Sequence, residues 1–226
     1  SPAAAAQLLG QVAEALDHAH ARFALVHRVV DRELNVKYAM KLINVRDAAE
    51  KGVNVDSMRN EAKMMQRLSH PNIVSYNCCF MHGREFCIVM EFADGGHLGE
   101  QIGKRHDVAT LRSWIEQTCK ALAYMHDLHV LHRDIKPANI LLRGARKKIK
   151  LADLGLSSIF ASTSAAAQTM VGTLLYMGPE RARGGKYGRA EDMWAVGCIA
   201  TELLTQTALH ARCAAAGKLF CLDGRL

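Results

Sequence analysis

The feature that most constrains this chain is the stretch at residues 132–139, which reads HRDIKPAN. It places a carboxylate at Asp134, a cation at Lys136 and a side-chain amide at Asn139. A carboxylate can orient an attacking hydroxyl, a cation can neutralise charge on a moving phosphoryl group, and oxygen ligands can hold Mg²⁺. The spacing therefore indicates phosphoryl-transfer chemistry. A surface loop that only happens to hold polar residues is the alternative, and it would suffice for an isolated His-Arg-Asp.

A second acidic motif, Asp153-Leu154-Gly155, begins 19 residues after Asp134. Between the two motifs, residues 140–142 and 149–151 are mainly apolar and predict two short strands joined by a basic turn. An isolated Asp is usually a turn or cap residue. Its distance from Asp134, across two strands, favours Asp153 as a second Mg²⁺ ligand beside Asn139.

Together these motifs resemble the catalytic loop and metal-binding motif of eukaryotic-type Ser/Thr protein kinases. Residues 38–41, YAMK, resemble the Val-Ala-Ile-Lys strand of that family, and residues 70–74, HPNIV, resemble the segment that follows its first helix. Residues 171–180, VGTLLYMGPE, resemble the end of its activation segment. The combination looks closest to NIMA-related kinases, and the resemblance covers residues 26–206.

The resemblance implies an α+β fold with two lobes. A small β-rich lobe is expected over residues 1–92, and a mainly helical large lobe over residues 93–226. The large lobe should be incomplete after the helix that begins near Asp192 and anchors the catalytic loop. Apolar spacing independently predicts a helix over residues 108–127 that is buried in the large lobe.

The resemblance also implies ATP and Mg²⁺ as cofactors and the Ser or Thr hydroxyls of proteins as acceptors. Asp134 and Lys136 would act on the acceptor and the moving phosphoryl group, and Lys41 would bind the α- and β-phosphates. Glu61, twenty residues after Lys41 on a predicted helix over residues 56–68, would pair with Lys41. The implied metal ligands are Asn139 and Asp153. The implied nucleotide site consists of Val26, Ala39, Lys41, Met90, Glu91, Ala93, Leu141 and Asp153.

The segment before residue 173 is rich in Ser, Thr and Ala, as a regulatory segment would be. Thr169 is the predicted phosphorylation site, and a phosphate there would find Arg133 as a partner. The competing sites are Ser162, Thr163 and Ser164.

The first 25 residues depart from the family. Ala19, Ala21 and Ala24 stand where kinases carry the three glycines of the phosphate-binding loop. A Cβ at these positions hinders the approach of backbone N–H groups to phosphates. The Ala content and apolar spacing predict a helix over about residues 4–20. A catalytically weak or inactive kinase-like scaffold and an incomplete kinase fragment are therefore alternatives to an active enzyme.

The amino-acid composition limits the kinds of partner expected for this chain. The 226 residues include 29 Lys and Arg against 22 Asp and Glu, and the seven Cys show no metal-ligand spacing. No apolar run approaches the ~20 residues of a membrane span, and no signal peptide is evident. We expect a cytosolic or nuclear protein without a membrane or nucleic-acid partner. The one basic cluster is interpreted as a solvated hairpin turn rather than a binding patch; it consists of Arg143, Arg146, Lys147, Lys148 and Lys150.

Overall fold

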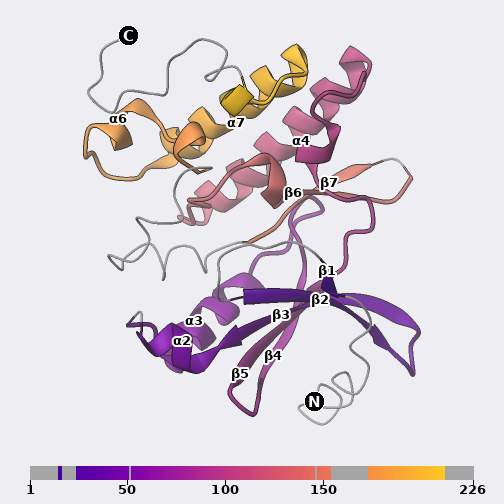
Figure 1. The fold of residues 1–226 in the computed structure, drawn as a ribbon, viewed down its shortest axis with the longest axis vertical. Coiled ribbons are helices and arrows are strands. Elements are labelled where there is room, and N and C mark those ends of the chain that lie inside the picture. The colour runs from indigo at the N-terminus through magenta and orange to yellow at the C-terminus, as the bar shows by residue number, and fades with distance from the viewer. Residues whose placement is uncertain (1–14, 17–23, 51, 146, 154–172, 212–226) are drawn as a thin grey trace. The chain divides into compact units, whose positions relative to one another are not determined.

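The computed structural model describes residues 15–16, 24–50, 52–145, 147–153 and 173–211 (Figure 1). The chain divides into two compact units. Among the described residues, the first unit comprises residues 15–16, 24–50, 52–69 and 74–93, and the second comprises residues 70–73, 94–145, 147–153 and 173–211. Among the described residues, no helix is long and apolar enough to cross a membrane.

The first unit is built on a five-stranded sheet in the order β1-β2-β3-β5-β4, with antiparallel neighbours throughout. The strands are β1 (Ala15–Leu16), β2 (Ala24–Asp31), β3 (Val36–Asn44), β4 (Tyr76–His82) and β5 (Glu85–Glu91). The β2–β3 turn is stabilised locally, because Asp31 Oδ1 accepts the backbone N–H groups of Glu33 at 2.9 Å and Leu34 at 3.0 Å.

Two helices, α2 (Val45–Glu50) and α3 (Val55–Gln66), follow β3. Asn54 caps α3 by accepting the N–H of Ser57 at 2.8 Å. Met58 and Ala62 of α3 pack on one face of the sheet, in an apolar cluster with Ile43, Phe86 and Ile88. The opposite face holds a second cluster of Val29, Met40, Cys87 and Val89. Apolar residues on both faces fit strands that are nearly continuous hydrophobic runs rather than strictly alternating ones.

The second unit contains two long helices, α4 (Val108–Asp127) and α7 (Arg189–Thr205), which pack against each other (Figure 1). Its other elements are the strands β6 (Ile140–Arg143) and β7 (Lys148–Leu151), the short helix α6 (Pro179–Ala182) and the 3₁₀ turns η2 (Leu98–Gln101), η3 (Pro137–Asn139) and η5 (Thr173–Tyr176). Asp107 caps α4 by accepting the N–H of Thr110 at 2.6 Å. Trp114, Leu122 and Met125 of α4 are buried, so this helix supplies much of the core of the unit.

The helix predicted over residues 4–20 is wrong where the structure describes that stretch. Ala15 and Leu16 form strand β1, and they pair with His27 and Val26 of β2. The physical reason is that an open sheet edge offers backbone hydrogen bonds that outweigh the small helix preference of two residues. The remainder of the predicted helix lies outside the described residues.

Candidate active site

Three of the predicted site residues form one hydrogen-bonded cluster in the loop before β6. Lys136 Nζ lies 2.9 Å from Asp134 Oδ2. Asn139 Nδ2 donates to the same Oδ2 at 2.9 Å and to the backbone carbonyl of Asp134 at 2.8 Å. Two donors on one carboxylate oxygen fix the orientation of the Asp134 side chain.

His132 holds this loop against the chain that leads to Asp153. The imidazole is fully buried, and its Nε2 lies 3.0 Å from the carbonyl oxygen of Ala152, while the N–H of Asp134 donates to its Nδ1 at 3.3 Å. A carbonyl can only accept and an amide N–H can only donate, so Nε2 carries the proton and Nδ1 does not. Burial lowers the pKa of His132, which agrees with a neutral ring.

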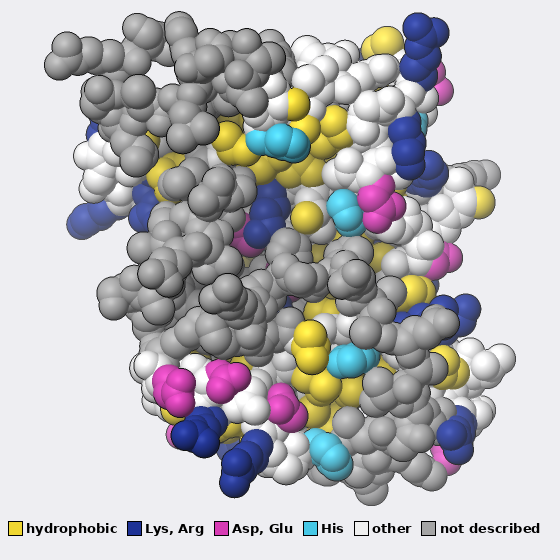
Figure 2. Space-filling model, in the orientation of Figure 1, with side chains coloured by type: hydrophobic (Ala, Val, Ile, Leu, Met, Phe, Trp, Pro, Cys, Tyr) yellow, Lys and Arg dark blue, Asp and Glu magenta, His cyan; other side chains and the backbone are white. Residues whose placement is uncertain are grey.

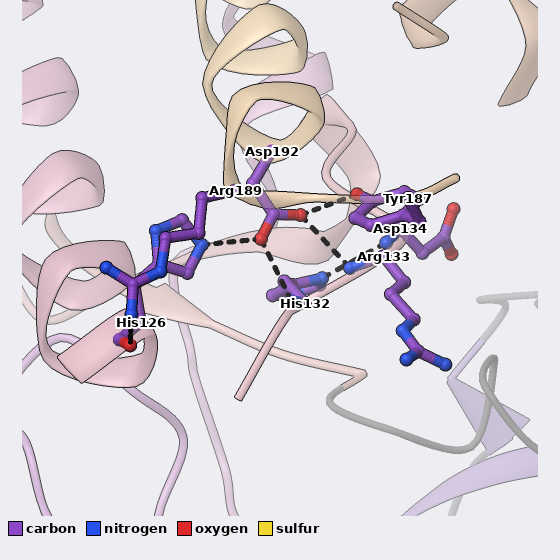
Figure 3. A network of polar contacts seen from close by, with 7 residues as sticks. All are labelled: His126, His132, Arg133, Asp134, Tyr187, Arg189 and Asp192. Atoms are coloured by element: carbon purple, nitrogen blue, oxygen red, sulfur yellow. Dashed lines mark hydrogen bonds and ion pairs between the residues drawn. The ribbon is translucent and has the colours of Figure 1, made fainter. Parts of the chain in front are cut away.

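A buried carboxylate, Asp192 at the start of α7, anchors the loop backbone (Figure 3). It accepts the N–H of His132 on Oδ2 and the N–H of Arg133 on Oδ1, both at 3.1 Å. Arg133 adopts a left-handed φ of 70°, which is uncommon for a residue with a Cβ. The two hydrogen bonds to Asp192 stabilise the backbone on either side of this conformation.

Two further side chains complete the network around Asp192. His126 Nε2 lies 2.7 Å from Oδ2, and the Tyr187 hydroxyl donates to Oδ1 at 2.6 Å (Figure 3). Burial alone would raise the pKa of Asp192, but the hydrogen bonds from His126, Tyr187 and the His132 backbone hold it below its usual value. The carboxylate is therefore a stable anion inside the unit.

Sequence reasoning did not identify His126 or Tyr187 as part of the site. Arg189, also missed, donates from Nη2 to the carbonyl of His126 at 2.6 Å. His126 lies in the last turn of α4 and Tyr187 lies just before α7, so no local spacing connects them to residues 132–139. The proximity of His126 to Asp192 exists only in the folded chain, whereas Tyr187 lies five residues before Asp192 in the sequence.

A backbone hydrogen bond connects the two chain segments that carry the predicted metal ligands Asn139 and Asp153. The N–H of Ala152 donates to the carbonyl of Asn139 at 2.9 Å, which places Asp153 directly after that contact. Among the described residues, Asn139 Oδ1 is one of two buried side-chain oxygens that have no hydrogen-bond partner. Such an oxygen is costly to bury unless something binds it. A hard cation that prefers oxygen ligands, such as Mg²⁺, fits this requirement.

In the first unit, strand register groups four of the predicted nucleotide-site residues. Val26 lies opposite Lys41, and Ala39 lies opposite Met90. Cross-strand partners share a face, and so do residues two apart on one strand. Val26, Ala39, Lys41 and Met90 therefore lie on one face of the sheet, where the Lys41 side chain is buried.

The other predicted residues are placed as follows. Glu91 ends β5, with its N–H donated to the carbonyl of Ser75 at 2.8 Å, and Ala93 follows in the connection after β5. Leu141 lies on β6 of the second unit, opposite Lys150. Glu61 belongs to α3, but its side chain lies outside the described residues, so its pairing with Lys41 stays a prediction. Thr169 also lies outside them.

A sequence model of the protein kinase domain matches residues 20–216. The chain belongs to the protein kinase family. It is 36% identical over 198 residues to the MAP kinase kinase kinase wis4 of Schizosaccharomyces pombe; the match covers 81% of this chain and 14% of the relative. It is 34% identical over 179 residues to the serine/threonine-protein kinase nekl-2 of Caenorhabditis elegans, covering 74% and 49%. It is 40% identical over 149 residues to the serine/threonine-protein kinase Nek8 of Danio rerio, covering 64% and 21%.

Among solved structures, the chain is similar to Rad53 residues 1–466 in complex with AMP-PNP, with a TM-score of 0.70 and 28% identity. That match covers 88% of this chain and 48% of the Rad53 chain. The predicted kinase fold and the predicted relation to Ser/Thr kinases, members of the Nek family included, are confirmed. The chain spans less than half the length of these relatives.

Proposed function

We propose that this kinase-family chain transfers the γ-phosphoryl group of ATP to Ser or Thr hydroxyls of protein substrates. The observation that carries the proposal is the cluster in which Lys136 and Asn139 both contact Asp134 Oδ2, with Asn139 Oδ1 buried and without a partner. This cluster provides a positioned carboxylate, a cation and a free metal-ligand oxygen on one loop. The relatives include two serine/threonine-protein kinases, nekl-2 and Nek8, which supports a Ser or Thr hydroxyl as the acceptor.

In this proposal Asp134 accepts a hydrogen bond from the acceptor hydroxyl and takes its proton as the new bond forms. Lys136 stabilises negative charge on the moving phosphoryl group. The neutral His132 and the anionic Asp192 do not touch the reacting atoms. They hold the loop backbone so that Asp134 points in one direction.

The family and the AMP-PNP complex of Rad53 support ATP as the nucleotide. Asn139 and Asp153 would hold Mg²⁺, which neutralises phosphate charge when bound. Lys41 would hold the α- and β-phosphates, with Glu61 orienting it. The adenine would contact apolar side chains and the backbone of the β5 end; the residues concerned are Val26, Ala39, Met90, Glu91, Ala93 and Leu141.

Regulation by phosphorylation follows from the same loop. A phosphate on Thr169 would carry a charge of about −1.5 to −2 and would pair with the Arg133 guanidinium. Such pairing would order the segment before residue 173 and raise activity.

A catalytically weak or inactive kinase-like protein is the second candidate. The specific observation that favours it is the presence of Ala19, Ala21 and Ala24 at positions where the family has glycine. Weak phosphate binding would leave a nucleotide-binding or scaffold role.

The test begins with thermal stability in the presence of ATP, with and without Mg²⁺. A ligand at about a hundred times its Kd stabilises a protein by about 2.7 kcal/mol, so binding gives a clear shift. We expect stabilisation that requires Mg²⁺ and that is lost in Asp153→Ala. Transfer of labelled phosphate to a Ser/Thr peptide then separates the candidates. Stabilisation without transfer would support the inactive protein, and no stabilisation would contradict both.

A further inference from the structure

Strand β4 forms one edge of the sheet in the first unit. Among the residues that the structure describes, it pairs with β5 alone. The strand at the opposite edge, β1, is two residues long, whereas β4 has seven. An edge strand presents backbone N–H and C=O groups that can pair with another chain. The β4 edge is therefore the longer template for such pairing.

The turn between β4 and β5 determines which backbone groups of β4 face outward. His82 pairs with Glu85 across a two-residue turn, and Gly83 has the positive φ, 56°, of the first central residue of a type II′ turn. Such a turn closes on a hydrogen-bonded pair, and hydrogen-bonded and non-hydrogen-bonded pairs alternate along antiparallel strands. Met81 and Cys79 therefore belong to non-hydrogen-bonded pairs with β5. Their N–H and C=O groups point away from β5, toward the open edge.

The sequence of β4 has few of the features that protect a sheet edge from pairing. Proteins usually protect an edge with Lys or other charged residues, with Pro, or with a bulge. Residues 76–81, YNCCFM, contain no charged residue and no Pro. The register shift of a bulge falls between Tyr76 and Cys78, so the register with β5 is regular over residues 78–82. This regular part of the edge is open to another strand.

The side chains of the regular stretch are mostly apolar and only partly covered. No residue of β4 is buried, whereas residues 86–89 of β5 all are. Cys78 and Phe80 lie beside the second apolar cluster of the sheet, and Met81 is 38% exposed. Figure 2 shows hydrophobic side chains at the surface where Figure 1 draws β4 and β5. A strand added at this edge would therefore cover apolar side chains as well as backbone groups.

We propose that β4 pairs antiparallel with β4 of a second copy of this chain, about a two-fold axis at Phe80. This axis places Cys79 opposite Met81 of the partner subunit, so that the outward N–H and C=O groups of both residues are paired. Phe80 faces Phe80 of the partner subunit in the closer, non-hydrogen-bonded position, and cross-strand aromatic pairs stabilise a sheet. An axis at Cys79 would instead place Met81 opposite Asn77 of the partner subunit, where the bulge interrupts regular pairing.

A second copy suits this edge better than an unrelated extended peptide. Residues 76–81 are uncharged, so two copies bring no like charges opposite each other along this stretch. One two-fold contact also covers the open edges of both subunits, whereas a peptide covers only one. The contact is small, with about four backbone hydrogen bonds, so the dimer is weak and reversible.

The first experiment is analytical ultracentrifugation of the 226-residue chain under reducing conditions. We expect a monomer–dimer equilibrium between about 10 μM and 1 mM, the range in which weak complexes associate. Met81→Pro removes an outward N–H without removing a hydrogen bond to β5, and Pro is tolerated at such edge positions. It should weaken the dimer about tenfold, because one donor is lost in each subunit. The matched control, Met81→Ala, keeps the N–H and should change association less.

The second experiment tests the register by disulfide trapping with oxidised glutathione, in a chain that carries Cys78→Ser and Cys79→Ser. Cα atoms of a non-hydrogen-bonded pair lie about 4.5 Å apart, which suits a disulfide. Phe80→Cys should therefore give a covalent dimer, and His82→Cys, which lies away from the axis, should give little. Equal trapping of the two variants would overturn the register. A wild-type chain that stays monomeric throughout, or a dimer that Met81→Pro leaves intact, would overturn the proposal itself.

Discussion

The catalytic loop at residues 132–139 and the β6–β7 hairpin lie in the same unit, but their charged side chains are arranged differently. In the loop, Asp134 contacts Lys136 and Asn139, and Asp192 accepts hydrogen bonds from four neighbours. At the hairpin, Arg143 faces Lys148 across the strands. A largely buried network in which every polar group has a hydrogen-bond partner fixes the geometry of its members, and breaking it costs much stability. Exposed like charges that face each other across two strands do not stabilise the strand pairing.

The largest expected effect is a loss of phosphotransfer when Asp134, at the centre of the hydrogen-bonded loop, is changed. Asp134→Asn keeps the size of the side chain but removes the group that accepts the proton of the hydroxyl. We expect turnover to fall by about a hundred- to ten-thousandfold, the usual contribution of a general base. Nucleotide-dependent thermal stabilisation should persist, because Asp134 orients the acceptor hydroxyl and does not hold ATP. Wild-type turnover in this variant would contradict the assigned role.

The second prediction concerns the anchor of the same network. Asp192→Ala leaves the N–H groups of His132 and Arg133 and the side chains of His126 and Tyr187 without their shared acceptor. We expect the free energy of unfolding in urea to fall by about 3–5 kcal/mol, as for a broken buried charge network. Tyr187→Phe, which removes one donor only, should cost about 1 kcal/mol. Comparable losses in the two variants would mean that Asp192 does not organise the loop.

The third prediction uses pH to probe the buried imidazole. The pKa of His132 is lowered in the folded protein, so below about 6.5 the unfolded chain binds a proton that the folded chain does not. The contribution of the neutral His132 to the free energy of unfolding is fully present above pH 6.5. It is lost as the pH falls, by up to about 1.4 kcal/mol per pH unit. His132→Phe should therefore flatten the fall of the thermal midpoint between neutral and mildly acidic pH.

The matched control for that measurement is His210→Phe, because His210 is exposed. It should keep the wild-type pH dependence. The same slope in wild type and His132→Phe would show that His132 does not titrate differently in the two states.

The smallest expected effect is a gain at the hairpin. Lys148→Glu turns a repulsive cross-strand pair into an attractive one, and it should raise the free energy of unfolding by about 0.2–1 kcal/mol. Lys148→Gln removes the repulsion without adding an attraction, so its gain in stability should be smaller. Differential scanning calorimetry of the two variants and wild type measures both steps. A loss of stability in Lys148→Glu would mean that this pair is not the repulsion inferred from the register.

Several elements were predictable because their determinants are local. The helix predicted over residues 108–127 is α4 (Val108–Asp127), and the strands predicted around the basic turn are β6 and β7. The cluster of Asp134, Lys136 and Asn139 was also predictable, because six consecutive residues carry all three groups. Hydrophobic periodicity and short-range spacing in the sequence are sufficient to predict these features.

The conformation of residues 15–16 and the contacts around Asp192 could be known only from the folded chain. Ala15 and Leu16 have sequence neighbours typical of a helix, but a sheet edge beside them decided their conformation. His126 and Asp192 come from separate parts of the chain, and the packing of α4 against α7 brings them together, whereas Tyr187 lies only five residues before Asp192. The sequence by itself determined the kinase family, the catalytic motif and the long helices, since each is written in contiguous residues. Tertiary structure decided which buried groups from α4 and α7 hold the loop, because those contacts join residues that sequence spacing does not relate.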